Sequence, residues 1–376
     1  MIPSNYRPSR VVIDLDCVKH NVREEIKRLD ESKELFAVVK ANGYGHGAVE
    51  TAQAALDAGA SGLCVSNLDE ALELRQANIN GPILVLGYVN SAYIEIAAKN
   101  QITVTATNLE WLKEVNERIQ SPISIHLKID TGMGRIGLRT EEEMLGAKNI
   151  LDKQPLIDFE GIFTHFSKAD SKDESHLNLQ QERFSKALDI FGREMKYIHT
   201  SNSATALWHG AWESNLVRYG DALYGMNPSG NELESPFELK QALTLETEII
   251  HIKQLEKGEK VGYGATYETS GNEWIGTLPI GYADGLIRRY QGFEVLVSGK
   301  KAPIVGRVCM DQCMIRLEEE LPVGTKVTIF GHNQERFNSV QSGAEYVGTI
   351  NYEVTCGLTD RLPRVYRENG SEVLDK

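Results

Sequence analysis

A single lysine follows an apolar run near the beginning of the chain. Lys40 comes directly after Phe36-Ala37-Val38-Val39. Apolar surroundings remove water from an amine and lower its pKa, which suits a lysine that forms a Schiff base. The glycines of the next segment, ANGYGHG at 41–47, permit a tight loop, and Tyr44 within that loop can reach the same place. The alternative is a lysine whose ammonium only reaches out to water from the rim of a fold.

Other polar residues occupy comparable places, each just after a short apolar run. They are Arg135, His165, Asn202, Ser203 and Arg218, with Gly220 close behind. Ser203 and Gly220 together offer a hydroxyl and backbone N–H groups, which can bind a phosphate without a basic patch. A serine near a glycine is a weak signal by itself. His165 has the alternative of a histidine whose hydrogen bonds are satisfied inside the fold.

These residues need a fold that brings the ends of separate strands together. From residue 35 to about residue 224, short β-branched runs alternate with amphipathic helical stretches. The expected strands are 35–41, 62–66, 82–88, 102–107, 123–130, 158–166, 197–202 and 214–220, and the expected helices are 48–59, 68–78, 91–100, 108–119, 141–153, 178–195 and 204–210. About eight consecutive βα units without a hairpin signal predict an α/β fold, a (β/α)8 barrel of the TIM type. A Rossmann fold would need GxGxxG at the first βα turn, which this chain lacks.

The pattern changes after about residue 239. Apolar and polar residues then alternate between turn clusters, which predicts a mostly β domain. We expect the barrel to occupy residues 1–238 and the β domain residues 239–376. The first strand, VVIDL at 11–15, can pair with either, and spacing does not decide. In such a barrel the active site lies at the C-terminal ends of the strands, where the polar residues above fall.

Composition excludes several classes of protein. The 376 residues include 40 Lys and Arg against 53 Asp and Glu, a net charge of −13, which argues against nucleic-acid and anionic-membrane partners. The first ten residues lack an apolar signal core, and no apolar run approaches the ~20 residues of a membrane span. The five cysteines lack zinc-site spacing, so we expect reduced thiols, no metal and a cytoplasmic protein, with a Cys309–Cys313 disulfide as the alternative.

Motifs along the whole chain resemble the bacterial alanine racemase family. They are VVKANGYGHG (38–47), HLKIDTGMGRIG (126–137), GIFTHF (161–166), SNSA (201–204), VRYGDALYG (217–225), VGYGATY (261–267), LPIGYADG (278–285), GRVCMDQ (306–312) and NYEVTCGLTDRLPR (351–364). The resemblance implies a fold-type III pyridoxal-phosphate enzyme. It also implies a homodimer with shared active sites that acts on a small amino acid, interconverts L- and D-alanine and supplies D-alanine for peptidoglycan.

The same resemblance assigns the cofactor site. It implies pyridoxal 5′-phosphate in aldimine linkage to Lys40, with Arg218 facing the pyridine nitrogen and His165 hydrogen-bonded to Arg218. A guanidinium there keeps the ring nitrogen unprotonated, because two cations would otherwise be adjacent. The remaining cofactor-binding residues implied are Tyr44, Asn202, Ser203, Gly220, Asp221 and Tyr352. An apolar residue is frequent in the family where this chain has Asp221.

Racemisation needs acid–base groups on both faces of the substrate. The resemblance implies Lys40 and Tyr263 of the other subunit, with Arg135 lowering the pKa of the tyrosine. An interface-packed strand tyrosine is the alternative for Tyr263. The substrate-binding residues implied are Arg135, Tyr282, Cys309, Met310 and Asp311. Lys128 matches a lysine that is often carbamylated and pairs with Arg135.

Three other functions compete with this interpretation. A racemase for serine or a basic amino acid shares the architecture. A decarboxylase of the same architecture would carry an acidic partner for the pyridine nitrogen, against which Arg218 argues. A non-catalytic pyridoxal-phosphate protein would lack the β domain and Tyr263.

Overall fold

The computed structural model describes residues 2–192 and 194–373, which divide into two compact units. The barrel unit comprises Val18–Gly43 and Ala48–Lys240, and the sheet-rich unit comprises the described residues of Met1–Cys17, Tyr44–Gly47 and Gln241–Lys376. Parts of the predicted domains and of the helix expected at 178–195, namely residues 1, 193 and 374–376, lie outside the described residues. Over the described ranges, no helix is long and apolar enough to cross a membrane.

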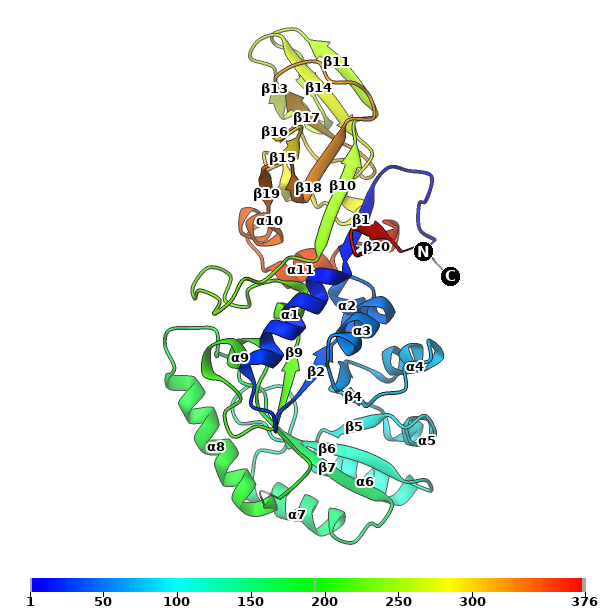
Figure 1. The fold of residues 1–376 in the computed structure, drawn as a ribbon, viewed down its shortest axis with the longest axis vertical. Helices are drawn as coiled ribbons and strands as arrows, with labels where there is room; N and C mark the ends of the chain where they lie inside the picture. The colour runs from blue at the N-terminus through cyan, green and yellow to red at the C-terminus, as the bar shows by residue number, and fades with distance from the viewer. Residues whose placement is uncertain (1, 193, 374–376) are drawn as a thin grey trace. The chain divides into compact units, whose positions relative to one another are not determined.

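Eight parallel strands form the core of the barrel unit (Figure 1). They are β2 (Glu34–Val38), β3 (Gly62–Val65), β4 (Ile83–Val85), β5 (Thr103–Ala106), β6 (Ile123–Lys128), β7 (Ile157–Phe163), β8 (Tyr197–His199) and β9 (Leu216–Tyr219). Neighbours pair in the order β8-β7-β6-β5-β4-β3-β2-β9. Across the seam between β8 and β9, Asn215 N donates to Ile198 O at 3.0 Å and Arg218 N to Ser201 O at 2.9 Å. The predicted (β/α)8 barrel is confirmed.

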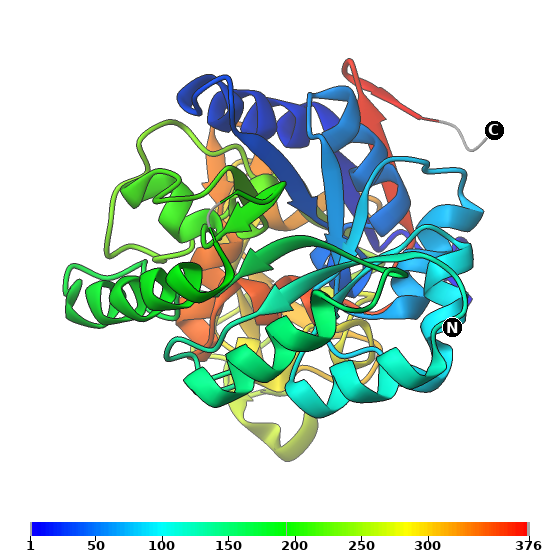
Figure 2. The same cartoon turned by 90° about the horizontal axis from the view of Figure 1, so that it is seen from below.

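Helices lie outside the strands, as Figure 2 shows. They are α1 (Leu15–Arg28), α3 (Ala48–Asp57), α4 (Leu68–Gln76), α5 (Ile94–Lys99), α6 (Leu109–Arg118), α7 (Glu141–Leu151), α8 (Ser175–Phe191) and α9 (Ser203–His209). Side chains at their first turns accept the otherwise unpaired N–H groups, as Asn67, Asn108 and Asn202 do. Each helix buries one apolar face, for example Trp111, Leu112 and Val115 of α6.

The sheet-rich unit contains a sheet of eleven strands and a separate two-stranded ribbon. The sheet has the order β11-β14-β17-β16-β15-β18-β10-β1-β20-β21, with β19 paired to β18, and the ribbon is β12-β13. The strands are β1 (Arg10–Asp14), β10 (Leu243–Glu248), β11 (His251–Leu255), β12 (Lys260–Val261), β13 (Tyr267–Glu268), β14 (Glu273–Leu278), β15 (Glu294–Val297), β16 (Lys300–Val305), β17 (Cys313–Leu317), β18 (Lys326–Asn333), β19 (Arg336–Asn338), β20 (Arg364–Glu368) and β21 (Ser371–Glu372). Two short helices accompany them, α10 (Val340–Val347) and α11 (Asn351–Cys356).

The first strand of the chain belongs to this second sheet. β1 pairs antiparallel with β10, where Val12 lies opposite Thr244, and parallel with β20, where Val12 lies opposite Val365. Figure 1 shows β1 beside β20, the two ends of the colour scale. Val11, Val12 and Ile13 are buried, so β1 contributes to the core of the sheet-rich unit.

Candidate active site

A left-handed turn follows Lys40, which lies two residues after the end of β2. β2 ends at Val38, and Ala41, Asn42 and Gly43 have φ of 52°, 52° and 60° and ψ of 51°, 51° and 43°. A side chain in this region costs roughly 1–2 kcal/mol per residue, so the surroundings must hold the turn in place. Glu70 Oε1 accepts from Ala41 N at 2.8 Å, and Asn42 Oδ1 accepts from Ala48 N at 3.0 Å. The chain thus changes direction immediately after Lys40.

Arg218 lies in β9 and is buried inside the barrel. Its Nη1 donates to His199 Nδ1 at 2.6 Å and to His199 O at 3.2 Å. Its Nη2 donates to Thr164 O at 2.9 Å and Thr200 O at 3.2 Å, and contacts His165 Nδ1 at 3.4 Å. Burial lowers the pKa of Arg218 to about 10, and the charge of Arg135 adds to the effect. These five acceptors are all neutral.

His199 is the residue that the sequence analysis missed here. Its 2.6 Å contact with Arg218 is shorter than the 3.4 Å contact of His165. His199 lies in β8, and its ring stacks on Phe163 with centroids 4.6 Å apart. Burial and the charge of Arg218 lower the pKa of His199 well below its usual value, so the ring is neutral near pH 7. The sequence could have indicated this contact, because His199 and Arg218 lie in consecutive expected strands.

Ser203 and Gly220 are brought together at the ends of β8 and β9. Ser203 Oγ accepts from Gly220 N at 2.8 Å. Asn202 precedes α9, and its Oδ1 accepts from Thr205 N at 2.9 Å, which fixes the backbone on which Ser203 is carried. Asp221, which follows Gly220, has its side chain buried.

Lys128 is a second buried cation of the barrel interior. It ends β6, and its Nζ donates to Ile129 O at 2.9 Å. Burial lowers the pKa of Lys128 to about 7, and Arg218 and Arg135 add to this while Asp130 opposes it. The Phe163 ring centroid lies 5.2 Å from Lys128 Nζ and 5.3 Å from Arg218 Cζ, so the aromatic face stabilises both cations.

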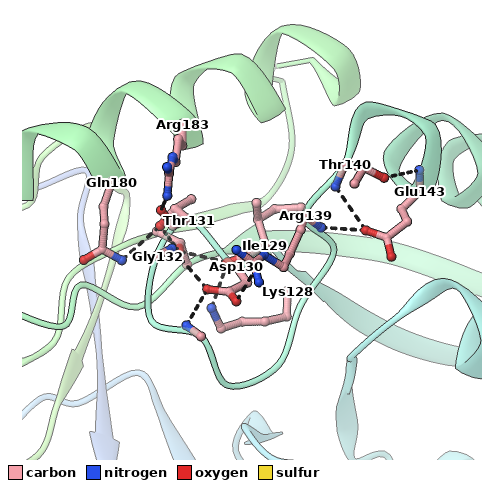
Figure 3. Close-up of polar contacts among 12 residues, drawn as sticks. Lys128, Ile129, Asp130, Thr131, Gly132, Arg139, Thr140, Glu143, Gln180 and Arg183 are labelled. Atoms are coloured by element: carbon pink, nitrogen blue, oxygen red, sulfur yellow. Dashed lines mark hydrogen bonds and ion pairs between the residues drawn. The ribbon is translucent and has the colours of Figure 1, made fainter. Parts of the chain in front are cut away.

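The loop after β6, which carries Arg135, is held at several points (Figure 3). Asp130 Oδ1 accepts from Gly132 N at 3.1 Å and Gly134 N at 2.9 Å, which closes the turn. From α8, Arg183 Nη1 donates to Thr131 O at 3.0 Å and Gln180 Nε2 to Thr131 Oγ1 at 3.1 Å (Figure 3). Arg135 itself is exposed at the tip of this anchored loop.

Tyr44 and Tyr352 meet in the sheet-rich unit. Their ring centroids are 5.8 Å apart. The loop at 44–47 is seated on α11, since a Cβ on Gly45 would lie 2.2 Å from Thr355 O. Arg364 Nε also donates to Gly45 O at 3.1 Å.

The predicted substrate-binding residues of this unit also lie together. Tyr282 N donates to Cys309 O at 3.0 Å, and Ala283 N donates to Met310 O at 3.0 Å. Tyr282 and Met310 have exposed side chains, while Asp311 forms an ion pair with Arg361 at 2.8 Å. Cys309 and Cys313 are both free thiols.

Tyr263 lies in a short turn after β12, and a Cβ on the preceding Gly262 would lie 3.2 Å from Arg307 N, two residues before Cys309. Its side chain is 69% exposed. Gly262 and Gly264 on either side have φ of 76° and 73°, so the turn presents the tyrosine at its tip. The predicted site residues therefore form two sets, one in each unit.

Comparisons with known proteins identify the family of each part of the chain. The alanine racemase N-terminal domain family matches residues 13–228, and the alanine racemase C-terminal domain family matches residues 242–366. An alanine racemase of Pediococcus pentosaceus is 52% identical over 371 residues, which are 98% of this chain and 99% of the relative.

The chain belongs to the alanine racemase family.

Solved structures agree with this assignment. The crystal structure of alanine racemase from E. faecalis has a TM-score of 0.96 and 50% identity, covering 98% of this chain and 100% of that one. A histidine racemase from Leuconostoc mesenteroides has a TM-score of 0.92 and 31% identity, covering 98% and 100%. The chain is therefore an isomerase of the amino-acid racemase class.

Proposed function

We propose that this chain interconverts L-alanine and D-alanine with pyridoxal 5′-phosphate held on Lys40. The observation that carries the proposal is the setting of Arg218, a buried guanidinium whose hydrogen-bond acceptors among the described residues are all neutral. Such a residue can only donate, and its charge opposes a second positive charge next to it. A decarboxylase of this architecture would need an acidic partner for the pyridine nitrogen. In this proposal the cationic Arg218 takes that place.

The residues present fit the cofactor. Ser203 Oγ accepts from Gly220 N at 2.8 Å and can donate its own hydrogen to a phosphate, with Asn202 fixing the backbone that carries Ser203. Because the side chain of Asp221 is buried, we propose that its backbone, rather than its carboxylate, contacts the phosphate. Tyr44 and Tyr352 supply the remaining phosphate contacts in this proposal, and His165 supports Arg218.

The protein's own task is to move a proton at the α-carbon. Pyridoxal phosphate supplies the electron sink that allows this proton to leave. Lys40 Nζ takes or returns the proton on one face, and the hydroxyl of Tyr263 of the partner subunit does so on the other. Arg135, exposed on an anchored loop, binds the substrate and supplies positive charge near that hydroxyl.

This mechanism requires a homodimer with shared active sites. We propose a cofactor-binding domain at 1–238, of which β1 pairs with the sheet of the second domain, and a β domain at 239–376 that completes the site of the partner subunit. Tyr282, Cys309 and Met310 are linked through their backbones and line the substrate side of the pocket. The Asp311 carboxylate forms an ion pair with Arg361, so its role is to shape the pocket wall.

Lys128 is proposed to be carbamylated. Carbamate formation needs a neutral amine, and a pKa of about 7 provides one near physiological pH. The product is an anion, which would turn the repulsion between Lys128 and Arg135 into attraction.

The proposed substrate is alanine because relatives at 50% and 52% identity are named alanine racemases. The histidine racemase at 31% identity shows that the same fold serves a different substrate. We propose that the chain works in the cytoplasm, consistent with its free thiols, and supplies D-alanine for peptidoglycan.

The test uses the purified protein with pyridoxal phosphate. Borohydride should attach the cofactor permanently to Lys40, as peptide mapping would show. In deuterium oxide, both L- and D-alanine should exchange the α-proton, and serine and histidine should react much more slowly. Normal racemisation by Tyr263→Phe would contradict the two-base assignment, and faster turnover of serine or histidine would contradict the substrate.

A further inference from the structure

A chain of polar contacts leads from the buried Arg218 through two buried histidines to Lys196, whose side chain is exposed. Arg218 Nη1 contacts His199 Nδ1 at 2.6 Å, and His199 Nε2 contacts His126 Nδ1 at 2.8 Å. His126 Nε2 lies 3.5 Å from Glu160 Oε2, and Glu160 Oε1 accepts from Lys196 Nζ at 2.5 Å. We call these five residues the relay. Its members come from β9, β8, β6, β7 and the residue before β8.

Irregular backbone places two members of the relay. Ile125 pairs with Phe159 and His126 with Gly161, so Glu160 is an extra residue in β7 without a partner in β6. Such a bulge re-aims a side chain, and here it turns Glu160 toward His126. A Cβ on Gly161 would lie 3.1 Å from the His126 ring and 2.9 Å from Tyr197 Cβ, so glycine makes room for the histidine.

Arg218 at one end of the relay and Glu160 at the other favour a proton on the same ring nitrogen of each histidine. Arginine only donates, so His199 Nδ1 must accept, and a neutral His199 then carries its proton on Nε2. That proton points at His126 Nδ1, which leaves the His126 proton on Nε2, facing the Glu160 carboxylate. Burial lowers the pKa of both histidines and the charge of Arg218 adds to this; Glu160 opposes the effect at His126 without reversing it, so both rings are neutral at pH 7.

Glu160 keeps its charge at the outer end. Burial raises the pKa of this carboxyl, but the contacts with His126 and Lys196 outweigh it and lower the pKa to about 2. If Glu160 lost its charge, the Nε2 proton on His126 would lose its electrostatic support at that end, and the constraint from Arg218 would act alone. A proton on His126 Nδ1 would force one onto His199 Nδ1 as well, and two donors would then meet at the 2.6 Å contact with Arg218.

We propose that His126 and Glu160 are positioning residues that, through His199, fix the hydrogen bonds of Arg218 and hence its hold on the pyridine nitrogen. The effect on the pyridine nitrogen rests on the proposed function. The state of the histidines does not, because every relay contact lies within the barrel unit.

The first test needs no cofactor. Two-bond 1H–15N correlation spectra of the labelled apoprotein report which ring nitrogen of each histidine is protonated, and single His→Gln variants assign the signals. We expect His126 and His199 to carry their protons on Nε2 at pH 7. Protons on Nδ1 of either ring would overturn the proposal.

The second test removes the charge at the far end. Glu160→Gln should weaken the Nε2 preference of His126, alter the absorbance spectrum of the holoprotein, and lower kcat about tenfold with KM for alanine little changed. Glu160→Asp, which keeps the charge, should restore part of each signal. Asp158→Asn is the matched control, since this exposed carboxylate of the same strand accepts from Ser124 Oγ at 3.0 Å, outside the relay.

The outcomes separate the two proposals. Unchanged proton positions or an unchanged spectrum in Glu160→Gln would overturn the relay, even if the protein racemises alanine. A wild-type protein that holds no cofactor on Lys40 would overturn the proposed function, while the apoprotein spectra would still decide the proton positions in the relay.

Discussion

Replacing Lys128 by methionine should stabilise the apoprotein, and more so at low pH. Burial lowers the pKa of Lys128 from 10.5 to about 7 in the folded barrel, with Arg218 and Arg135 adding to the effect. The unfolded chain therefore binds an extra proton between about pH 7 and pH 10.5. Because the folded pKa is the lower one, this lysine costs stability below the unfolded pKa, and the cost grows as the pH falls toward 7.

The size of the effect follows from the two pKa values. At ~1.4 kcal/mol per pH unit, the full difference between 10.5 and about 7 corresponds to roughly 5 kcal/mol at pH 6 and to about 1 kcal/mol at pH 10. Methionine also loses the hydrogen bond to Ile129 O, worth about 1 kcal/mol. We therefore expect Lys128→Met to raise the free energy of unfolding by about 4 kcal/mol at pH 6 and to leave it nearly unchanged at pH 10.

Urea denaturation of the apoprotein measures this directly. The buffers should be purged of carbon dioxide so that the amine stays unmodified. Lys113→Met, on the exposed face of α6, is the control and should show little difference at either pH. A gain for Lys128→Met that is the same at pH 6 and pH 10 would refute the reasoning, because apolar burial by methionine alone has no pH dependence.

Three further predictions test the site. Ser203→Ala removes the acceptor of Gly220 N, so it should lower the free energy of unfolding by about 1–3 kcal/mol and weaken retention of pyridoxal phosphate on dialysis. No change in either would contradict the proposed phosphate site at Ser203. In 13C-bicarbonate at pH 8 the protein should show one carbamate resonance that Lys128→Met lacks, and its absence from the wild type would reject carbamylation. Gly45→Ala places a Cβ 2.2 Å from Thr355 O at a φ of 82°, so it should destabilise by more than about 2 kcal/mol in thermal unfolding. A Gly45→Ala protein as stable as the wild type would show that the loop at 44–47 moves freely.

Much of the barrel could be predicted from the sequence because strand and helix periodicities differ. Every expected strand from 35–41 to 214–220 overlaps a barrel strand, since short β-branched runs stand clear of amphipathic helices. The proximity of Ser203 and Gly220 could also be predicted, because the C-terminal ends of parallel strands lie on the same side of a barrel.

Contacts that depend on side-chain direction were not predictable. His126 and His199 stand in buried strands, where a histidine gives the same pattern whether it serves the core or the site. The partner of Glu160 depends on a one-residue shift in pairing, which no periodicity records. Spacing also could not assign β1 to a sheet, because its pairing with β10 and β20 joins residues from both ends of the chain.

That last pairing has a consequence for biosynthesis. Residues 10–14 leave the ribosome first, but the strands on either side of them are residues 243–248 and 364–368. The barrel strands, from residue 34 to residue 219, are complete while β1 still has both edges open. An apolar strand that waits unpaired during translation is exposed to intermolecular pairing. Truncation before β20, or slow elongation near the 3′ end of the message, should therefore reduce the soluble yield without altering a single barrel residue.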